Sequence, residues 1–362
     1  MPSSKTVVIA AAGSRKTTFL VEEALSNSDK QTLITTFTIE NLQQIRKYIV
    51  ERKGFVPSNI KLVGWYTFLL QDCARPYRNY LYERRIKTIS MVEGQSVPYA
   101  KRSDTGTFYF EDGDKIYTDK IADFACRCNE ESGGAMIKRL EGVFDKIFID
   151  EVQDLAGPDL KLLELLFKSQ LEMLIVGDNR QATYFTNHSR TNRGKRGINI
   201  IELFQSWERA GLCVISERNE CYRCIQPICD FADSLYPDMP KTISKVEADN
   251  NHSGIFFVRP SDVNTYYQKY SPIVLRYSKA SNTLGLPAMN FGLSKGQSFD
   301  RVLIFPTKPI QKYLKTKDIN DVGDVAKFYV ALTRARQSVA IVCDEKSFDT
   351  KGFFQLDLFS LS

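Results

Sequence analysis

Two adjacent carboxylates follow an apolar run in the middle of the chain. Residues 146–154 read Lys-Ile-Phe-Ile-Asp-Glu-Val-Gln-Asp, which is typical of a buried strand that ends at Asp150 and Glu151. Adjacent acids repel each other unless a cation or a proton-transfer task occupies them. One acid can hold Mg²⁺ while the other deprotonates an attacking water. A strand that runs into a charged loop explains this short pattern equally well, so the rest of the chain must decide.

A loop of small residues follows a second apolar run near the N-terminus. Residues 7–18 read Val-Val-Ile-Ala-Ala-Ala-Gly-Ser-Arg-Lys-Thr-Thr, and a helical pattern comes next. The backbone N–H groups of such a loop and the start of its helix can bind phosphate. We expect Lys16 to reach the β- and γ-phosphates of a nucleotide and Thr17 to share a Mg²⁺ ion with Asp150. The candidate nucleotide-binding residues of the loop are Gly13, Ser14, Arg15, Lys16, Thr17 and Thr18.

Arg15 departs from the usual phosphate loop, which has Gly immediately before the Lys. A side chain at this position must point away from the phosphates. We therefore expect the geometry of the loop to differ from the usual one, and the rate of nucleotide hydrolysis to differ with it.

Composition favours a globular cytoplasmic protein. The chain has 362 residues, of which 43% are hydrophobic, enough for two cores of ordinary size. A strand pattern begins almost at once, so we expect no signal peptide, and no apolar stretch approaches the ~20 residues that span a bilayer. The net charge of +6 is mild. Two basic clusters suit either nucleic acid or a solvated face: Arg75, Arg78, Arg84, Arg85 and Lys87, and Arg190, Arg193, Lys195 and Arg196.

The eight cysteines raise the question of a metal site. Cys221, Cys224 and Cys229 lie close in sequence, as do Cys126 and Cys128, whereas His188 and His252 lie elsewhere. A zinc site usually needs a second well-spaced pair of ligands. We therefore expect reduced, mostly buried thiols rather than zinc.

Strand and helix patterns alternate as in parallel α/β sheets. The expected strands of a first series are 6–11, 32–36, 60–64, 146–150 and 172–177, and those of a second are 213–216, 254–258, 272–277, 301–305 and 338–343. Residues 75–140 interrupt the first series and contain a possible hairpin around 109–117. The expected domains are a first lobe made of 1–74 and 141–212, an insertion at 75–140, and a second lobe at 213–362.

Three further segments complete a recognisable order. Residues 174–184 read Leu-Ile-Val-Gly-Asp-Asn-Arg-Gln-Ala-Thr-Tyr, and Arg223 follows Tyr222 at the start of a helical pattern. Residues 329–336 read Tyr-Val-Ala-Leu-Thr-Arg-Ala-Arg, and we expect their two arginines, Arg334 and Arg336, to lie on a helix. Together with the loop and the acid pair, these segments resemble the UvrD/Rep-like superfamily 1 DNA helicases. The likeness extends over nearly the whole chain. It implies two RecA-like lobes with a nucleotide bound between them, a small insertion in the first lobe and no large accessory domain in the second.

The resemblance also implies roles for individual residues. Lys16, Asp150, Glu151, Gln181, Arg223 and Arg334 would act in catalysis, with Thr17 and Asp150 on the metal, and Tyr222 and Gly296 at the nucleotide. Gln181 would sense the γ-phosphate, and Tyr222 would stack on adenine. Arg223 and Arg334 would reach across the cleft to the γ-phosphate. The implied DNA contacts are Thr36, Phe37, Thr67, Phe68, Tyr184 and Phe291, and the implied cofactors are ATP and Mg²⁺.

Two functions remain open. The first is an ATP-dependent translocase or helicase on single-stranded or partially duplex DNA, with 3′ to 5′ polarity implied by the resemblance. The second is a nucleotide- and DNA-binding partner subunit with weak unwinding of its own, similar to helicase subunits that accompany nucleases in Gabija-type anti-phage systems. The apolar tail at 353–359 could dock such a nuclease partner, although packing on its own lobe is the more usual fate of such a segment.

Overall fold

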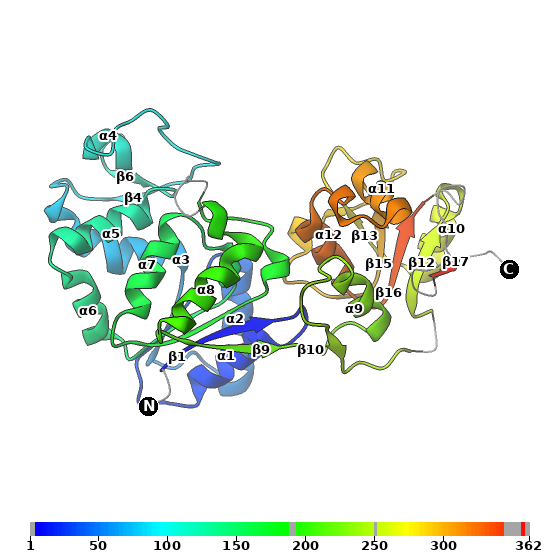
Figure 1. Ribbon diagram of the computed structural model, residues 1–362, viewed down its shortest axis with the longest axis horizontal. Helices are drawn as coiled ribbons and strands as arrows, with labels where there is room; N and C mark the ends of the chain where they lie inside the picture. The colour runs from blue at the N-terminus through cyan, green and yellow to red at the C-terminus, as the bar shows by residue number, and fades with distance from the viewer. Residues whose placement is uncertain (1–3, 188–192, 250–251, 344–355, 359–362) are drawn as a thin grey trace. The chain divides into compact units, whose positions relative to one another are not determined.

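The computed structural model describes residues 4–187, 193–249, 252–343 and 356–358. The chain forms two compact units (Figure 1). The first contains residues 1–10 and 16–217, and the second contains residues 11–15 and 218–362. Each unit is built on a six-stranded sheet, so the predicted α/β architecture with two parallel sheets is confirmed.

The sheet of the first unit has the strand order β3-β2-β7-β8-β1-β9, and the pairs from β3 to β1 are parallel. Its strands are β1 (Lys5–Ala10), β2 (Thr32–Thr36), β3 (Ile60–Gly64), β7 (Lys146–Ile149), β8 (Glu172–Gly177) and β9 (Val214–Arg218). The associated helices are α1 (Lys16–Leu25), α2 (Ile39–Lys53), α3 (Trp65–Phe68), α7 (Pro158–Phe167) and α8 (Ile200–Arg209), with short turns η3 (Val152–Asp154), η4 (Asn179–Gln181), η5 (Arg193–Lys195) and η6 (Gly197–Asn199). The strands therefore lie where their apolar runs predict them.

Successive residues of these strands enter different cores, as a sheet covered on both faces requires. Val7 belongs to the larger core, whereas Val8 packs with helices α1 and α2 on the opposite face. Helix α2 shows how local sequence sets such an element. Thr38 caps its N-terminus by accepting from Asn41 N, and Gly54 ends it in the left-handed conformation.

The predicted insertion adds a small sheet with strand order β4-β6-β5. The elements of this region, which begins just before the insertion, are π-helix η1 (Leu69–Ala74), η2 (Arg75–Tyr80), β4 (Thr88–Ser90), α4 (Thr105–Tyr109), β5 (Phe110–Glu111), β6 (Lys115–Tyr117), α5 (Ile121–Glu131) and α6 (Ala135–Val143). Strands β5 and β6 pair antiparallel, so the hairpin expected around 109–117 is confirmed. Aromatic rings of this segment, such as Tyr109 and Phe124, join the larger core of the first unit.

The second unit has the strand order β14-β13-β15-β16-β12-β17, all paired in parallel. Its main strands are β12 (Gly254–Val258), β13 (Ile273–Arg276), β14 (Met289–Asn290), β15 (Phe299–Phe305), β16 (Ala335–Val342) and β17 (Leu356–Leu358). The remaining elements are β10 (Glu220–Cys221), α9 (Gln226–Asp233), β11 (Ile243–Ser244), η7 (Pro260–Asp262), α10 (Val263–Tyr270), η8 (Gly292–Ser294), α11 (Lys308–Thr316), η9 (Ile319–Asp321) and α12 (Val325–Leu332).

Two expected boundaries differ from the structure. The strand expected to open the second lobe at 213–216 is β9, which lies beside β1 in the first sheet, and the division between the units falls after Glu217. Residues 11–15 were expected in the first lobe but pack in the second unit, because Ala11 N donates to Arg218 O and Tyr222 N donates to Gly13 O. The two halves of the phosphate loop thus belong to different units.

The end of the described chain packs on the second unit. Residues 356–358 form β17, which pairs with β12; the other residues of the apolar tail lie outside the described part. No helix among the described residues is long and apolar enough to span a bilayer.

Candidate active site

The acid pair and the start of helix α1 come together at one end of the first sheet. Asp150 and Glu151 follow β7 and are 2% and 6% exposed. The Thr17 hydroxyl donates to Asp150 Oδ2 at 2.7 Å, and Lys16 Nζ lies 3.1 Å from Glu151 Oε1. Four residues predicted from two distant motifs therefore form one cluster within the first unit.

Burial gives these acids unusual properties. Removal from water raises the pKa of Asp150 to about 6, and the adjacent charge of Glu151 adds to this rise, while Lys16 and Thr17 oppose it. Glu151 has a φ of +56°, which is strained for a residue with a side chain. An ionised pair in this setting is favourable only with positive charge beside it, which Lys16 supplies in part.

The oxygen atoms of Thr17 and Asp150 are suited to Mg²⁺. A hydroxyl and a carboxylate are hard donors, and Mg²⁺ is usually held by one or two carboxylates together with waters and substrate phosphates. The described residues contain no group of three His, Cys, Asp or Glu side chains placed to hold a metal by themselves. The donor set therefore fits a cation that arrives with a phosphate better than a cation caged by protein.

A glutamine that the sequence prediction left without a role connects the acid pair to the predicted sensor. Gln153 is fully buried; its side-chain amide donates to Glu151 Oε2, and its Oε1 accepts from Asp178 N at 3.2 Å. Asp178 Oδ2 in turn accepts from Gln181 Nε2 at 2.7 Å. A Cβ at Gly177 would lie 2.5 Å from Gln153 Oε1 and 2.9 Å from Val152 Cγ1, so a larger residue there would displace the Gln153 amide. Its position two residues after Glu151 is the sequence feature that could have suggested this role for Gln153.

The other half of the loop packs tightly on residues 221–223. A Cβ at Gly13 would lie 2.7 Å from Arg223 Cβ and 2.8 Å from Cys221 Sγ, and Gly13 has a φ of +76°, so only glycine fits. Ser14 is buried, and its hydroxyl has no hydrogen-bond partner among the described residues. Thr18 is partly buried in the first turn of α1.

The predicted nucleotide residues of the second unit are differently exposed. Tyr222 is 38% exposed, whereas Arg334 is 1% exposed and donates to Val330 O at 3.0 Å and Gln297 O at 3.1 Å. Arg223 donates to Thr333 O at 3.2 Å. Gly296 is partly buried with a φ of +85°.

Two sequence assignments around these arginines need correction. Arg334 follows the end of α12 and Arg336 lies in β16, so neither is on the predicted helix. Arg223 precedes α9 by three residues rather than opening it. Arg223 donates to Thr333 O, which is distant in sequence, whereas Arg334 donates back to Val330 O within the last turn of α12.

The predicted DNA contacts divide into accessible and buried residues. Tyr184 is 39% exposed, Thr67 is partly buried, and Phe37 is partly buried with its ring 5.6 Å from that of Tyr66. Thr36 is 1% exposed, and its hydroxyl has no hydrogen-bond partner among the described residues.

Phe68 and Phe291 are fully buried in the cores of the first and second units. Their rings pack against core side chains, so their position gives no support to base stacking. Both residues match the family's motif because the sequence alone does not distinguish a core aromatic residue from a surface one.

A buried polar network that no sequence motif indicates holds Thr186, two residues after Tyr184. Asp159 accepts from Trp65 Nε1 and from the Thr186 hydroxyl, both at 2.7 Å, and burial raises its pKa to about 6. Tyr66 donates to Thr186 O at 3.0 Å, and Thr186 N donates to Asp154 O at 2.9 Å. The network ties the segment after Tyr184 to the segment after Glu151.

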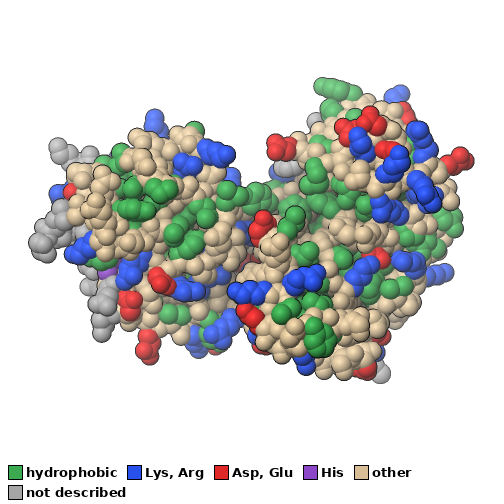
Figure 2. Space-filling view, turned by 180° about the vertical axis from the view of Figure 1, so that it is seen from behind, with side chains coloured by type: hydrophobic (Ala, Val, Ile, Leu, Met, Phe, Trp, Pro, Cys, Tyr) green, Lys and Arg blue, Asp and Glu red, His purple; other side chains and the backbone are tan. Residues whose placement is uncertain are grey.

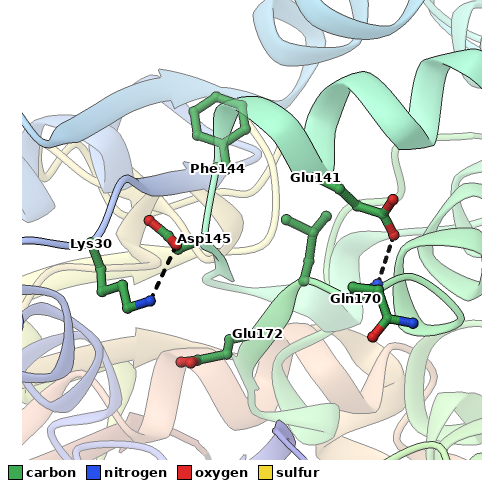
Figure 3. Close-up of a pocket in the computed structure, with 7 residues that line it drawn as sticks. Lys30, Glu141, Phe144, Asp145, Gln170 and Glu172 are labelled. Carbon is green, nitrogen blue, oxygen red and sulfur yellow. Dashed lines mark hydrogen bonds and ion pairs between the residues drawn. The ribbon is translucent and has the colours of Figure 1, made fainter.

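A shallow pocket lies at the opposite end of the first sheet (Figure 3). Lys30 and Asp145, which precede β2 and β7, form a 3.3 Å ion pair, and Glu141 accepts from Gln170 N at 2.7 Å. Glu172 pairs with Lys146 at 3.0 Å. These carboxylates have partners on the protein, and the pocket lies at the wrong end of the strands for the acid pair.

The two remaining sequence hypotheses concern charge and thiols. Arg84, Arg85 and Lys87 are exposed on the insertion, where Figure 2 shows Lys and Arg side chains interspersed with Asp and Glu. Arg190 and His188 lie outside the described residues. All eight cysteines are buried, as expected for most of them. The thiols of Cys224 and Cys229 lower the pKa of Cys221 by hydrogen bonding.

One family model matches part of the chain. Residues 109–191 match the UvrD/REP helicase N-terminal domain. This segment contains the acid pair and the Gln181 turn, so the resemblance seen in the motifs is confirmed over this part of the chain.

Solved structures of viral helicases are similar to the chain at low identity. "The structure of PRRSV helicase" matches at 16% identity and a TM-score of 0.46, over 95% of this chain and 54% of that one. "Crystal structure of Arterivirus nonstructural protein 10 (helicase)" matches at 17% and 0.47, over 94% and 60%. "Complex structure of Arterivirus nonstructural protein 10 (helicase) with DNA" matches at 15% and 0.47, over 94% and 61%. The chain thus spans little more than half the length of these proteins.

Proposed function

We propose that the protein is an ATP-dependent translocase or helicase that acts on single-stranded DNA. The observation that carries the proposal is the cluster of Lys16, Thr17, Asp150 and Glu151, in which a phosphate-loop lysine and threonine contact a buried acid pair. The match of residues 109–191 to a helicase domain supports the same class of activity.

Each residue has a distinct task in this proposal. Thr17 and Asp150 would hold Mg²⁺, which neutralises phosphate charge when bound. Lys16 would exchange Glu151 for the phosphates when nucleotide arrives, and this exchange frees Glu151 to orient and deprotonate water. Gln153 keeps the Glu151 carboxylate in place throughout.

Coupling to DNA would pass through hydrogen bonds of the first unit. Gln181, the proposed γ-phosphate sensor, is tied to Gln153 through Asp178, and Tyr184 follows the sensor by three residues. Loss of the γ-phosphate would change the contacts of Gln181 and so the presentation of Tyr184 to a base. Arg223 and Arg334 are the proposed phosphate-contacting arginines of the second unit.

The decisive test is ATP hydrolysis with and without single-stranded DNA. We expect the wild type to be stimulated by DNA, and Lys16→Ala to lose hydrolysis. Lys30→Ala is the matched control, since it breaks another lysine–carboxylate pair of the first unit at the far end of the sheet. Duplexes with a 3′ or a 5′ tail then test the proposed 3′ to 5′ polarity. DNA binding without stimulated hydrolysis would favour the partner-subunit alternative.

A further inference from the structure

The side chain of Arg15 covers one face of the Tyr222 ring, and the helicase resemblance assigns this ring to the nucleotide base. The Arg15 guanidinium carbon lies 4.1 Å from the centre of the Tyr222 ring. Both residues are exposed, and both belong to the second unit, with residues 11–15 packed on residues 218–223. The contact is therefore a property of that unit alone.

Several interactions hold the Arg15 and Tyr222 side chains against each other. Arg15 has a φ of +60°, an unfavourable conformation for any residue except glycine. Tyr222 N donates to Gly13 O at 2.9 Å, and the Tyr222 hydroxyl donates to Glu220 at 2.5 Å. Glu220 is itself paired with Lys245 at 3.0 Å. The ring is fixed at both ends, and the loop backbone directs Arg15 onto its face.

A guanidinium and a base cannot occupy the same face of one ring. At 4.1 Å the guanidinium is in direct contact with the ring, and such cation–π contacts at exposed sites contribute modestly. A purine that stacks on this face of Tyr222 must first displace Arg15. Displacing Arg15 therefore weakens binding of the base and leaves binding of the triphosphate unchanged.

We propose that Arg15 and Tyr222 form an intramolecular latch that competes with the nucleotide base and weakens nucleoside triphosphate binding relative to binding of the bare triphosphate. The latch rests on the proposed function, because it requires that Tyr222 stacks on the base. It assigns a regulatory role to the residue that replaces the usual glycine.

Arg15→Ala tests the latch by calorimetric titration of the full chain with Mg·ATP and with Mg·tripolyphosphate. Because the contact is exposed, we expect ATP to bind about two- to five-fold more tightly to the variant. Affinity for tripolyphosphate should stay the same, since it has no base. Arg52→Ala is the matched control: its guanidinium lies over Tyr48 at 6.0 Å in the first unit.

Two further variants separate the latch from backbone strain. Arg15→Gly relieves the left-handed strain as well as the contact, and it should tighten ATP binding to the same extent as Arg15→Ala. If only Arg15→Gly tightens binding, strain rather than the latch is responsible. In a Tyr222→Ala background, Arg15→Ala should have no effect on ATP affinity.

The remaining outcomes also decide between the two proposals. Weaker ATP binding by Arg15→Ala would show that Arg15 supports the base, and unchanged binding would show that the contact is irrelevant; either result overturns the latch alone. Failure of the wild type and every variant to bind ATP or tripolyphosphate would overturn the proposed function, and the latch with it.

Discussion

The two halves of the phosphate loop have opposite environments. Lys16 and Thr17 contact buried carboxylates of the first unit, in a cluster set by the ends of β7 and α1. Residues 11–15 are fixed by backbone hydrogen bonds to the second unit and end in an exposed cation–π contact. The first half contacts a buried acid pair in which burial raises the pKa of Asp150, and the second half makes an exposed contact between Arg15 and Tyr222 that is suited to modulation.

This contrast indicates that the residues of one sequence motif can belong to different structural units. The chain passes from the first unit to the second and back within residues 10–16. Gly13 and Arg15 within this stretch both have positive φ. Variants on the two sides should therefore differ in both the size and the kind of their effects.

The largest effect should come from the acid pair. We expect Glu151→Gln to lower ATP turnover by about 10⁴-fold, the upper range for loss of a general base, while Mg·ATP still binds through Asp150 and Thr17. Single-turnover hydrolysis and a binding titration measure the two quantities. Glu164→Gln, which alters an exposed acid on α7, is the control. Normal turnover by Glu151→Gln would remove the acid pair from the chemistry.

Arg334 tests whether the second unit also contributes to hydrolysis. We expect Arg334→Ala to lower the rate by about 10³-fold, as loss of an arginine finger does. It should also lower the unfolding free energy by about 1–3 kcal/mol, because Val330 O and Gln297 O lose their donor. Rates must therefore be expressed per folded molecule. Arg336→Ala, which loses only an exposed pair with Asp300, is the control; a destabilised Arg334→Ala protein with a normal rate would leave Arg334 a structural role only.

Tyr184 tests the connection of the first unit to DNA. We expect Tyr184→Ala to weaken single-strand binding by about 1–3 kcal/mol, the range for one stacked base, and to reduce DNA stimulation while basal hydrolysis remains. The ring is 39% exposed, so the melting temperature should change little. Fluorescence anisotropy and thermal unfolding on one preparation separate the cases, with Tyr99→Ala, at 97% exposure, as the control. A lower melting temperature with unaltered DNA affinity would show that Tyr184 is a packing residue.

The sequence predicts the strands and the acid cluster well for a physical reason. Apolar runs that end in polar residues are local signals, and parallel strands bring their carboxyl ends to one edge whatever their order. Thr17 and Asp150 could therefore be paired without knowledge of the fold.

Long-range contacts are not encoded in this local way. Nothing near Arg15 indicates that its partner is Tyr222, and nothing in β9 indicates that it joins β1. Phe68 and Phe291 resemble surface aromatics because local sequence does not show which side of a strand end faces a core. Gln153 lies within the motif, but its role depends on Asp178, which follows strand β8 and is far from it in sequence.

The last prediction concerns the pH dependence of the acid pair. Asp150 has a pKa of about 6 in the folded protein against 3.8 in the unfolded chain, so protonation favours the folded form. Without Mg²⁺, this group should add stability as the pH falls from 7 towards 4 and lose that contribution as the pH rises through 6. Mg²⁺ requires the ionised carboxylate, so its affinity in the presence of ATP should fall about tenfold per pH unit below 6. Asp159, also near 6, shares the stability trend but lies in a separate network. Asp150→Asn should therefore abolish the pH dependence of Mg²⁺ affinity, whereas Asp159→Asn should leave it intact; an unchanged profile in Asp150→Asn would place the metal elsewhere.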